Sequence, residues 1–104
     1  MIELTTVERL GAHVGKTVCV RGWLYNLSSK GKLHFAQLRD GTGIVQCVLF
    51  KNNVPAELFE KLGHSGQESS LTLVGIVKED PRAPGGFEID VTQGEIHQSV
   101  QGYP

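Results

Sequence analysis

Hydrophobic and polar residues alternate along most of this chain with the two-residue period of β-strands, in runs separated by turn-forming residues. The alternation predicts five strands, at residues 17–26, 33–39, 44–50, 70–77 and 87–98. A turn at 28–32 separates the first two strands, and the Asp-Gly-Thr-Gly sequence at 40–43 is typical of a hairpin. Gly22, inside the first predicted strand, indicates a bulge or a sharp bend there.

Two segments have the features of helices instead. Thr5 and Glu8 have the spacing of a capping box and predict a short helix through about residue 12. Pro55 is typical of a first helical turn, and apolar residues follow it at helical spacing over residues 55–62. The order is therefore a leading helix, three strands, a helix and two strands. This is the order of a five-stranded Greek-key OB-fold barrel, and a small sandwich or an SH3-like barrel is the alternative.

The composition is that of an ordinary globular domain. With 104 residues, 39% of them hydrophobic, and a formal net charge of −1, residues 1–104 are expected to form one all-β domain. No apolar run approaches the roughly 18 residues that span a membrane, and the N-terminus does not resemble a signal peptide. We therefore expect a cytoplasmic protein with no membrane partner.

Residues that often carry chemistry are expected to be structural here. Cys19 and Cys47 fall within apolar strands and are expected to be reduced, buried thiols. The four histidines lack the spacing of metal ligands, so we expect no metal site, and no catalytic motif is present. His34 is expected to be a packed imidazole, and Trp23 is expected to pack in the barrel; contact with a nucleic acid is the alternative for each.

Basic residues are concentrated in the first part of the chain. Residues 9–39 contain six basic residues and no acidic one, whereas residues 40–104 contain nine acidic and four basic residues. A local cationic surface can bind phosphate even when the whole chain is near neutral. The basic segment is therefore compatible with a nucleic-acid ligand, although an ordinary solvated surface would give the same composition.

Phe35 is a large aromatic residue on what the alternation predicts to be the polar face of the second strand. Phe35, Gln37 and Arg39 share one face, and His34, Ala36 and Leu38 share the other. Aliphatic residues on the second face indicate that it is the buried one, which would leave Phe35 in solvent among cations. Bases of single-stranded RNA stack on such a ring while cations hold the phosphates. If the faces were inverted, Phe35 would be an ordinary core residue.

Three segments occur in a recognisable order: Val-Arg-Gly-Trp at residues 20–23, His-Phe-Ala-Gln-Leu-Arg-Asp-Gly at 34–41 and Gly-Ile-Val-Gln at 43–46. Together they resemble the N-terminal anticodon-binding domain of class IIb aminoacyl-tRNA synthetases, the group that charges aspartate, asparagine and lysine. The similarity extends from about residue 6 to residue 104, and the segment at 78–88 is most similar to the asparaginyl branch. The resemblance implies an OB-fold barrel that binds the anticodon loop of a tRNA.

The resemblance also implies which residues read the middle anticodon base, a uridine for all three amino acids. In this family the uridine stacks on an aromatic residue of the second strand, and a Gln and a Glu complete the site. The matching residues here are Phe35, Gln46 and Glu88. Their chemistry suits these roles, because Gln46 offers a donor and an acceptor and Glu88 can accept the N3 proton of uridine.

Weaker contacts to phosphates and to the rest of the loop are expected from polar and basic residues: Lys30, Lys32, Arg21, Arg39, Asn26, Ser28, Ser29 and Arg82. Arg39 could equally be a structural partner of Asp40. The arginine-rich segment of the aspartyl pattern is missing, so Asn26, Ser28 and Ser29 are the candidates for reading the first anticodon base. The loop at 81–86 is the candidate for the third base.

The class II catalytic motifs, which bind ATP and activate the amino acid, are absent, and residues 101–104 lie about where such a synthetase would enter its catalytic domain. The chain alone is expected to bind tRNA without a cofactor and to catalyse nothing. The resemblance implies a homodimeric parent enzyme that uses ATP and Mg²⁺ to attach asparagine to tRNA(Asn). The alternatives are an aspartyl enzyme, including one that accepts both tRNAs, and a standalone OB-fold module that binds tRNA or single strands without sequence preference.

Overall fold

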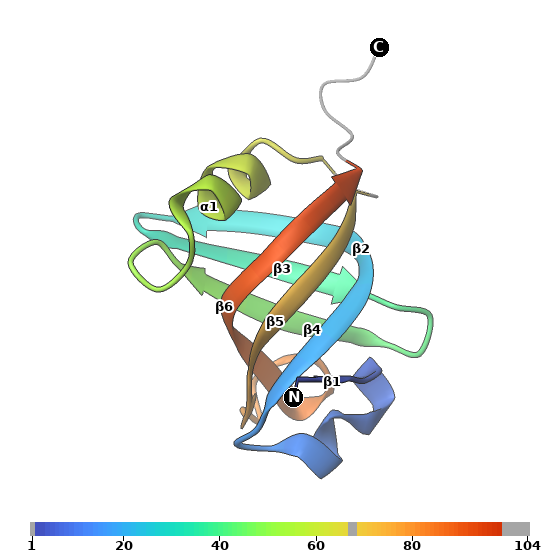
Figure 1. The fold of residues 1–104 in the computed structure, drawn as a ribbon. Coiled ribbons are helices and arrows are strands. Elements are labelled where there is room, and N and C mark those ends of the chain that lie inside the picture. Colours follow the sequence, from blue (N-terminus) through green and yellow to red (C-terminus); the bar gives the residue numbers. More distant parts are fainter. Residues whose placement is uncertain (1, 67–68, 99–104) are drawn as a thin grey trace.

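Five strands close into a barrel in the computed structural model, which describes residues 2–66 and 69–98 (Figure 1). They are β2 (Thr17–Lys30), β3 (Leu33–Arg39), β4 (Ile44–Phe50), β5 (Ser70–Glu79) and β6 (Phe87–Gln98). The pairings β2–β3, β3–β4, β5–β6 and β2–β5 are antiparallel, and a parallel β4–β6 pairing completes the ring. The predicted OB-fold barrel is confirmed, and the sandwich and SH3-like alternatives are wrong.

Four short elements surround the barrel: β1 (Glu3–Leu4), the 3-10 helix η1 (Val7–His13), the helix α1 (Ala56–Gly63) and the 3-10 turn η2 (Pro84–Gly86). The sequence did not predict β1, which pairs in parallel with β2. No described helix is long and apolar enough to cross a membrane. Residues 67–68, just before β5, and residues 101–104, which were expected near the entry to a catalytic domain, lie outside the described part of the chain.

The predicted capping box of the leading helix is wrong, because the N-terminus of η1 is capped by another part of the chain. Thr6 occupies the N-cap position without a side-chain cap hydrogen bond. The backbone N–H of Val7 donates to Asp40 Oδ2 at 2.8 Å, and that of Glu8 donates to Thr42 Oγ1 at 3.1 Å. The turn between β3 and β4 therefore holds η1 against the barrel.

The first barrel strand is longer than predicted and bends elsewhere. Ser28, Ser29 and Lys30 are strand residues that pair with β3, so the expected turn at 28–32 shortens to two residues around Gly31, whose φ is +60°. The register shift lies between Leu24 and Asn26, and not at Gly22. Gly22 is required for another reason: a Cβ there would lie 2.3 Å from the carbonyl oxygen of Arg39.

The barrel interior is filled by alternate aliphatic residues of its strands, as the two-residue period predicts. Val45, Cys47 and Leu49 of β4 are completely buried, and their neighbours along the strand are half-buried. Both cysteines are free thiols, Cys47 buried and Cys19 half-buried. Burial, with a smaller contribution from the charge of Glu88, raises the pKa of Cys47 to about 12. Cys47 is therefore a packing residue.

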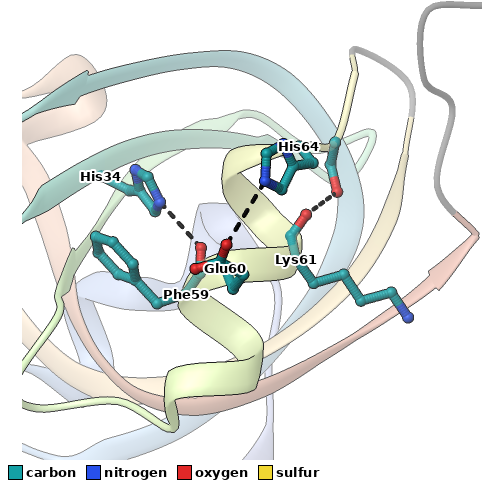
Figure 2. Close-up of polar contacts among 6 residues, drawn as sticks. His34, Phe59, Glu60, Lys61 and His64 are labelled. Atoms are coloured by element: carbon teal, nitrogen blue, oxygen red, sulfur yellow. Dashed lines mark hydrogen bonds and ion pairs between the residues drawn. The ribbon is translucent and has the colours of Figure 1, made fainter.

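Helix α1 lies across one end of the barrel, beside the hairpin that joins β2 to β3 (Figure 1). Its contact with β3 is made by His34, whose ring stacks on Phe59 with 3.9 Å between centroids (Figure 2). The Nε2 of His34 is 3.0 Å from the carbonyl oxygen of Phe59, and Nδ1 is 2.7 Å from the Ser29 hydroxyl. Because a carbonyl only accepts, Nε2 carries a proton. The packed imidazole expected at His34 is confirmed.

Candidate nucleic-acid interface

The outer surface of β3 carries Phe35. His34, Ala36 and Leu38 are buried inside the barrel, whereas Phe35 and Gln37 are half-buried and Arg39 is exposed. The alternation therefore places Phe35 on the outer face, as the sequence predicts, and the inverted arrangement does not occur. Because β3 pairs with a neighbour on each side, its outer face is continuous with those of β2 and β4.

Two rows of side chains cross this face, because residues paired across neighbouring strands project on the same side. The first row contains Ser28, Phe35, Val48 and Asp90. The second row contains Asn26, Gln37, Gln46 and Glu88. The three residues predicted for the middle base, Phe35, Gln46 and Glu88, thus lie in adjacent rows of one surface. The first row supplies an aromatic ring, and the second supplies amides and a carboxylate.

Gln46 and Glu88 are hydrogen-bonded to each other although they are 42 residues apart in the chain. The amide Nε2 of Gln46 donates to Glu88 Oε2 at 3.0 Å, in a partly buried position. The parallel pairing of β4 with β6, which closes the barrel, places the two residues opposite each other. The arrangement offers a fixed set of donors and acceptors beside the ring of Phe35.

A charge pair flanks this site on the next strand. Lys78 of β5 pairs with Glu88 in the ladder, and its ammonium group forms an ion pair with Asp90. The hydrogen bond and charge of Asp90, followed by the charge of Glu88, raise the pKa of Lys78 above its ordinary value. Lys78, Asp90 and Gln37 were not among the site residues predicted from the sequence. The alternation could have placed Gln37 and Asp90 on the outer face with the other site residues. The position of Lys78 beside the site follows only from the register of β5 with β6.

Basic side chains lie at the end of the face formed by the β2–β3 hairpin. Lys30 and Lys32 are both exposed there, two and four residues beyond Ser28 of the first row. The carbonyl oxygen of Lys32 accepts a hydrogen bond from the N–H of Lys51 at 2.8 Å, which ties the hairpin to the residue after β4. The hairpin therefore presents two exposed cations at the end of the face, beyond the row that contains Phe35.

The other predicted contact residues are distributed unevenly. Asn26 and Ser28 lie in the two rows, whereas the hydroxyl of Ser29 is bonded to His34. Arg21 pairs with Thr72 of β5, before β2 meets β3. The side chain of Arg82 is 94% exposed in the turn after β5, with Nε 3.7 Å from Asp80 Oδ1. The structure thus brings Asn26 and Ser28 to Phe35, but not Ser29, Arg21 or Arg82.

Arg39 and Trp23 lie at the opposite end of the face from the hairpin. The expectation that Trp23 packs in the barrel is wrong: Trp23 is 44% exposed, because the neighbouring Leu24 fills the interior position. The guanidinium of Arg39 lies 5.5 Å from the ring centroid of Tyr25. Asp40 accepts hydrogen bonds from Val7 and from Thr42, so its carboxylate serves the turn after β3.

The loop expected to contact the third base borders an apolar cavity of about 470 Å³ between η1, the β3–β4 turn and η2. Pro84, Gly85 and Phe87 line one side, and Ile44 of β4 lines the other. Ile44 and Gln46 share the outer face of β4 by alternation, so the cavity adjoins the second row. Within residues 2–66 and 69–98, no group of three or more His, Cys, Asp or Glu could hold a metal ion.

Known proteins are similar to this chain in both sequence and fold. A family model described as an OB-fold nucleic acid binding domain, tRNA_anti-codon, matches residues 18–96. An asparagine–tRNA ligase of Koribacter versatilis is 50% identical over 97 residues, which are 93% of this chain and 22% of that protein. The asparaginyl-tRNA synthetase of Pyrococcus horikoshii, crystallised with asparaginyl-adenylate, matches all of this chain with 24% of its own, at a TM-score of 0.89 and 45% identity.

A more distant match is the aspartyl tRNA synthetase of Entamoeba histolytica, with a TM-score of 0.82 and 26% identity over 99% of this chain and 23% of that one. In sequence the chain is therefore more similar to the asparaginyl than to the aspartyl protein. It spans about a quarter of the length of each of these three proteins.

Proposed function

Because this chain belongs to the tRNA_anti-codon family of OB-fold nucleic acid binding domains, we propose that it binds the anticodon loop of tRNA(Asn) and reads its middle uridine. The uridine stacks on Phe35, and the Gln46–Glu88 pair reads its hydrogen-bonding edge. The observation that carries this proposal is the half-buried, outward-facing ring of Phe35 in the row next to a bonded amide–carboxylate pair. A sequence-independent binder would need the ring and the cations, but not the ordered pair.

The remaining residues have supporting roles. Lys30 and Lys32 contact phosphates of the loop, which hold the RNA but carry no sequence information. Asn26 and Ser28 lie beside Phe35 and are the candidates for the first anticodon base. The loop at 81–86 and the adjoining cavity are the candidates for the third base.

The parent protein is proposed to be an asparagine–tRNA ligase. This proposal is supported by the asparagine–tRNA ligase of Koribacter versatilis and the asparaginyl-tRNA synthetase of Pyrococcus horikoshii, of which the chain matches 22% and 24%. Such an enzyme uses ATP, with Mg²⁺, to activate asparagine, and then esterifies the tRNA. It acts as a cytoplasmic homodimer. The present chain supplies tRNA recognition to that enzyme and takes no part in its chemistry.

The test is binding of this chain to anticodon stem-loops that carry GUU, GUC or GCU, compared at the same moderate salt concentration and then over a series of salt concentrations. GUU is expected to bind best, and GCU, which has cytidine in the middle, is expected to bind much more weakly. Phe35→Ala should weaken GUU binding by about 1–3 kcal/mol, the range for loss of one base–aromatic stack. Phe35→Tyr keeps the aromatic ring and should bind nearly as well as the unmodified chain.

Two results would contradict the proposal. If all three stem-loops bind alike and Phe35→Ala changes nothing, then the outer face of β3 does not bind the anticodon. If binding is strong but equal for all loops and falls steeply with salt, the chain is a general single-strand or tRNA binder. Near-equal affinity for GUU and GUC, with GCU still rejected, would favour an aspartyl parent that accepts both tRNAs.

A further inference from the structure

A glutamine side chain does not by itself distinguish uridine from cytidine. Its amide offers an acceptor on one side and a donor on the other, and a half-turn about its last bond exchanges them. Uridine presents an acceptor at position 4 and a donor at position 3, and cytidine presents the reverse order at the same positions. An amide that is free to turn can therefore pair with either base, and a site that depended on such an amide would not be selective.

The structure fixes the amide of Gln46 in one orientation. Nε2 of Gln46 lies 3.0 Å from Oε2 of Glu88, and an ionised carboxylate can only accept hydrogen bonds. The half-turned amide would direct its oxygen at the carboxylate, so two acceptors would face each other without a proton between them. Only the orientation with nitrogen toward β6 and oxygen away from β6 satisfies both groups.

From this geometry we infer that Glu88 is a positioning residue, which locks the Gln46 amide so that the site accepts uridine and rejects cytidine. Oε1 of Gln46 accepts the N3 proton of uridine, and the second hydrogen on Nε2 donates to O4. Cytidine in the same place would oppose donor to donor and acceptor to acceptor. This inference rests on the proposed function, and it changes the role of Glu88 from direct acceptor of the uridine proton to support of Gln46.

The neighbouring charges are consistent with this role. Lys78 pairs with Glu88 across the β5–β6 ladder, but its ammonium group is engaged in the ion pair with Asp90. Asp90 thus holds the nearby cation, and Oε2 of Glu88 accepts from Gln46. The backbone also fixes the pair, because β4 and β6 are paired at Gln46 and Glu88 and at the next two positions of each strand.

The decisive variant is Glu88→Gln, which has nearly the same shape but no charge. Its own amide can accept or donate, so it can satisfy the Gln46 amide in either orientation, and the lock is lost. If both orientations become equally populated, the affinity for GUU falls only about twofold, while the affinity for GCU rises and the preference for uridine collapses. Glu95→Gln, an exposed substitution on the same strand, is the matched control and should keep the preference.

The outcomes separate this inference from the proposed function. If the unmodified chain prefers GUU and depends on Phe35, but Glu88→Gln keeps the same ratio of GUU to GCU, the inference is wrong and the proposed function stands. If Glu88→Gln loses most GUU affinity and gains none for GCU, Glu88 contacts the uridine directly, which also overturns the inference. If the unmodified chain shows no preference between GUU and GCU, both fail.

A measurement on the unmodified chain keeps the inference testable if the variant does not fold. In nuclear magnetic resonance spectra, the side-chain NH₂ hydrogens of Gln46 should exchange with water more slowly than those of Gln93, an exposed glutamine of β6. Equal exchange at the two glutamines would show that Glu88 does not hold the Gln46 amide.

Discussion

Asp40 joins the leading helix to the barrel, and replacing it with asparagine tests how much that junction stabilises the fold. Its Oδ2 accepts the N–H of Val7 at 2.8 Å, and its Oδ1 accepts the N–H and the hydroxyl of Thr42 at 2.9 and 2.7 Å. Thr42 in turn accepts the N–H of Glu8. The carboxylate therefore accepts hydrogen bonds both from the turn after β3 and from the N-terminus of η1.

Asp40→Asn has the same shape but can accept hydrogen bonds at only one of the two terminal positions. If the amide oxygen keeps the two bonds from Thr42, the amide nitrogen faces the N–H of Val7, donor against donor. The loss is then one hydrogen bond to a charged acceptor, about 1.5–3 kcal/mol, with some weakening of the other two. We expect the free energy of unfolding to fall by about 2–3 kcal/mol, a large fraction of the 5–15 kcal/mol typical of a domain.

The same substitution predicts a change in acid sensitivity. Partial burial alone would raise the pKa of Asp40, but hydrogen bonds from Thr42, Val7 and Gly43 outweigh it and lower the pKa below the ordinary value of 3.8. A lowered pKa in the folded state means that the stabilising contribution is complete above that ordinary value. It is lost as the pH falls through the lower pKa of the folded state. The difference in stability between the unmodified chain and Asp40→Asn should therefore be constant near pH 7 and shrink below pH 3.8.

Urea denaturation at several pH values measures both effects, because the linear extrapolation gives the free energy of unfolding at each pH. Asp90→Asn is a matched control, since Asp90 forms an exposed ion pair and caps no backbone group, and it should destabilise the fold less. If Asp40→Asn is as stable as the unmodified chain, or if the difference persists unchanged at low pH, the carboxylate does not hold η1 in the way described.

Two further substitutions test the barrel and the basic hairpin. Gly22→Ala should lower the free energy of unfolding by about 1–3 kcal/mol, because its Cβ would lie 2.3 Å from the carbonyl oxygen of Arg39, and unchanged urea stability would contradict the close approach of β2 to β3. The double substitution of Lys30 and Lys32 by glutamine should reduce the salt dependence of stem-loop binding by about 1.4 in the slope of log K against log salt, without altering the preference for GUU. Lys16→Gln, exposed before β2, should leave that slope unchanged, and an equal effect of both changes would mean that the contribution is not local.

The sequence predicted the barrel because the alternation that identifies each strand is a pattern of residues close together in the chain. The two-residue alternation identifies the buried face of each strand, and the bounds of β3, β4 and β6 agree with those of the prediction. The alternation also placed Phe35 outside. It could not give the end of β2, because Ser28 and Ser29 have turn-like side chains, and only their partners in β3 show that they continue the strand.

The sequence pattern also could not predict contacts between elements that are far apart in the chain. Gly22 was recognised as unusual, but the cause is the backbone of Arg39 and not a bulge. Trp23 was expected inside the barrel, but the neighbouring Leu24 fills the interior position and leaves Trp23 outside. The capping of η1 by the β3–β4 turn likewise joins residues more than 30 positions apart.

In the proposed site, the position of the Gln46–Glu88 pair depends on the closure of the barrel. Phe35 belongs to a strand that is paired antiparallel on both sides, so its position is set by neighbours close in sequence. Glu88 is placed beside Gln46 by the parallel β4–β6 contact, which has three residue pairs and joins the two parts of the chain on either side of α1. If the chain reads the uridine as proposed, stacking requires only the β2–β3–β4 meander, whereas discrimination between uridine and cytidine requires the closed barrel. We expect a change that separates β4 from β6 to reduce the preference for uridine more than it reduces the affinity for RNA.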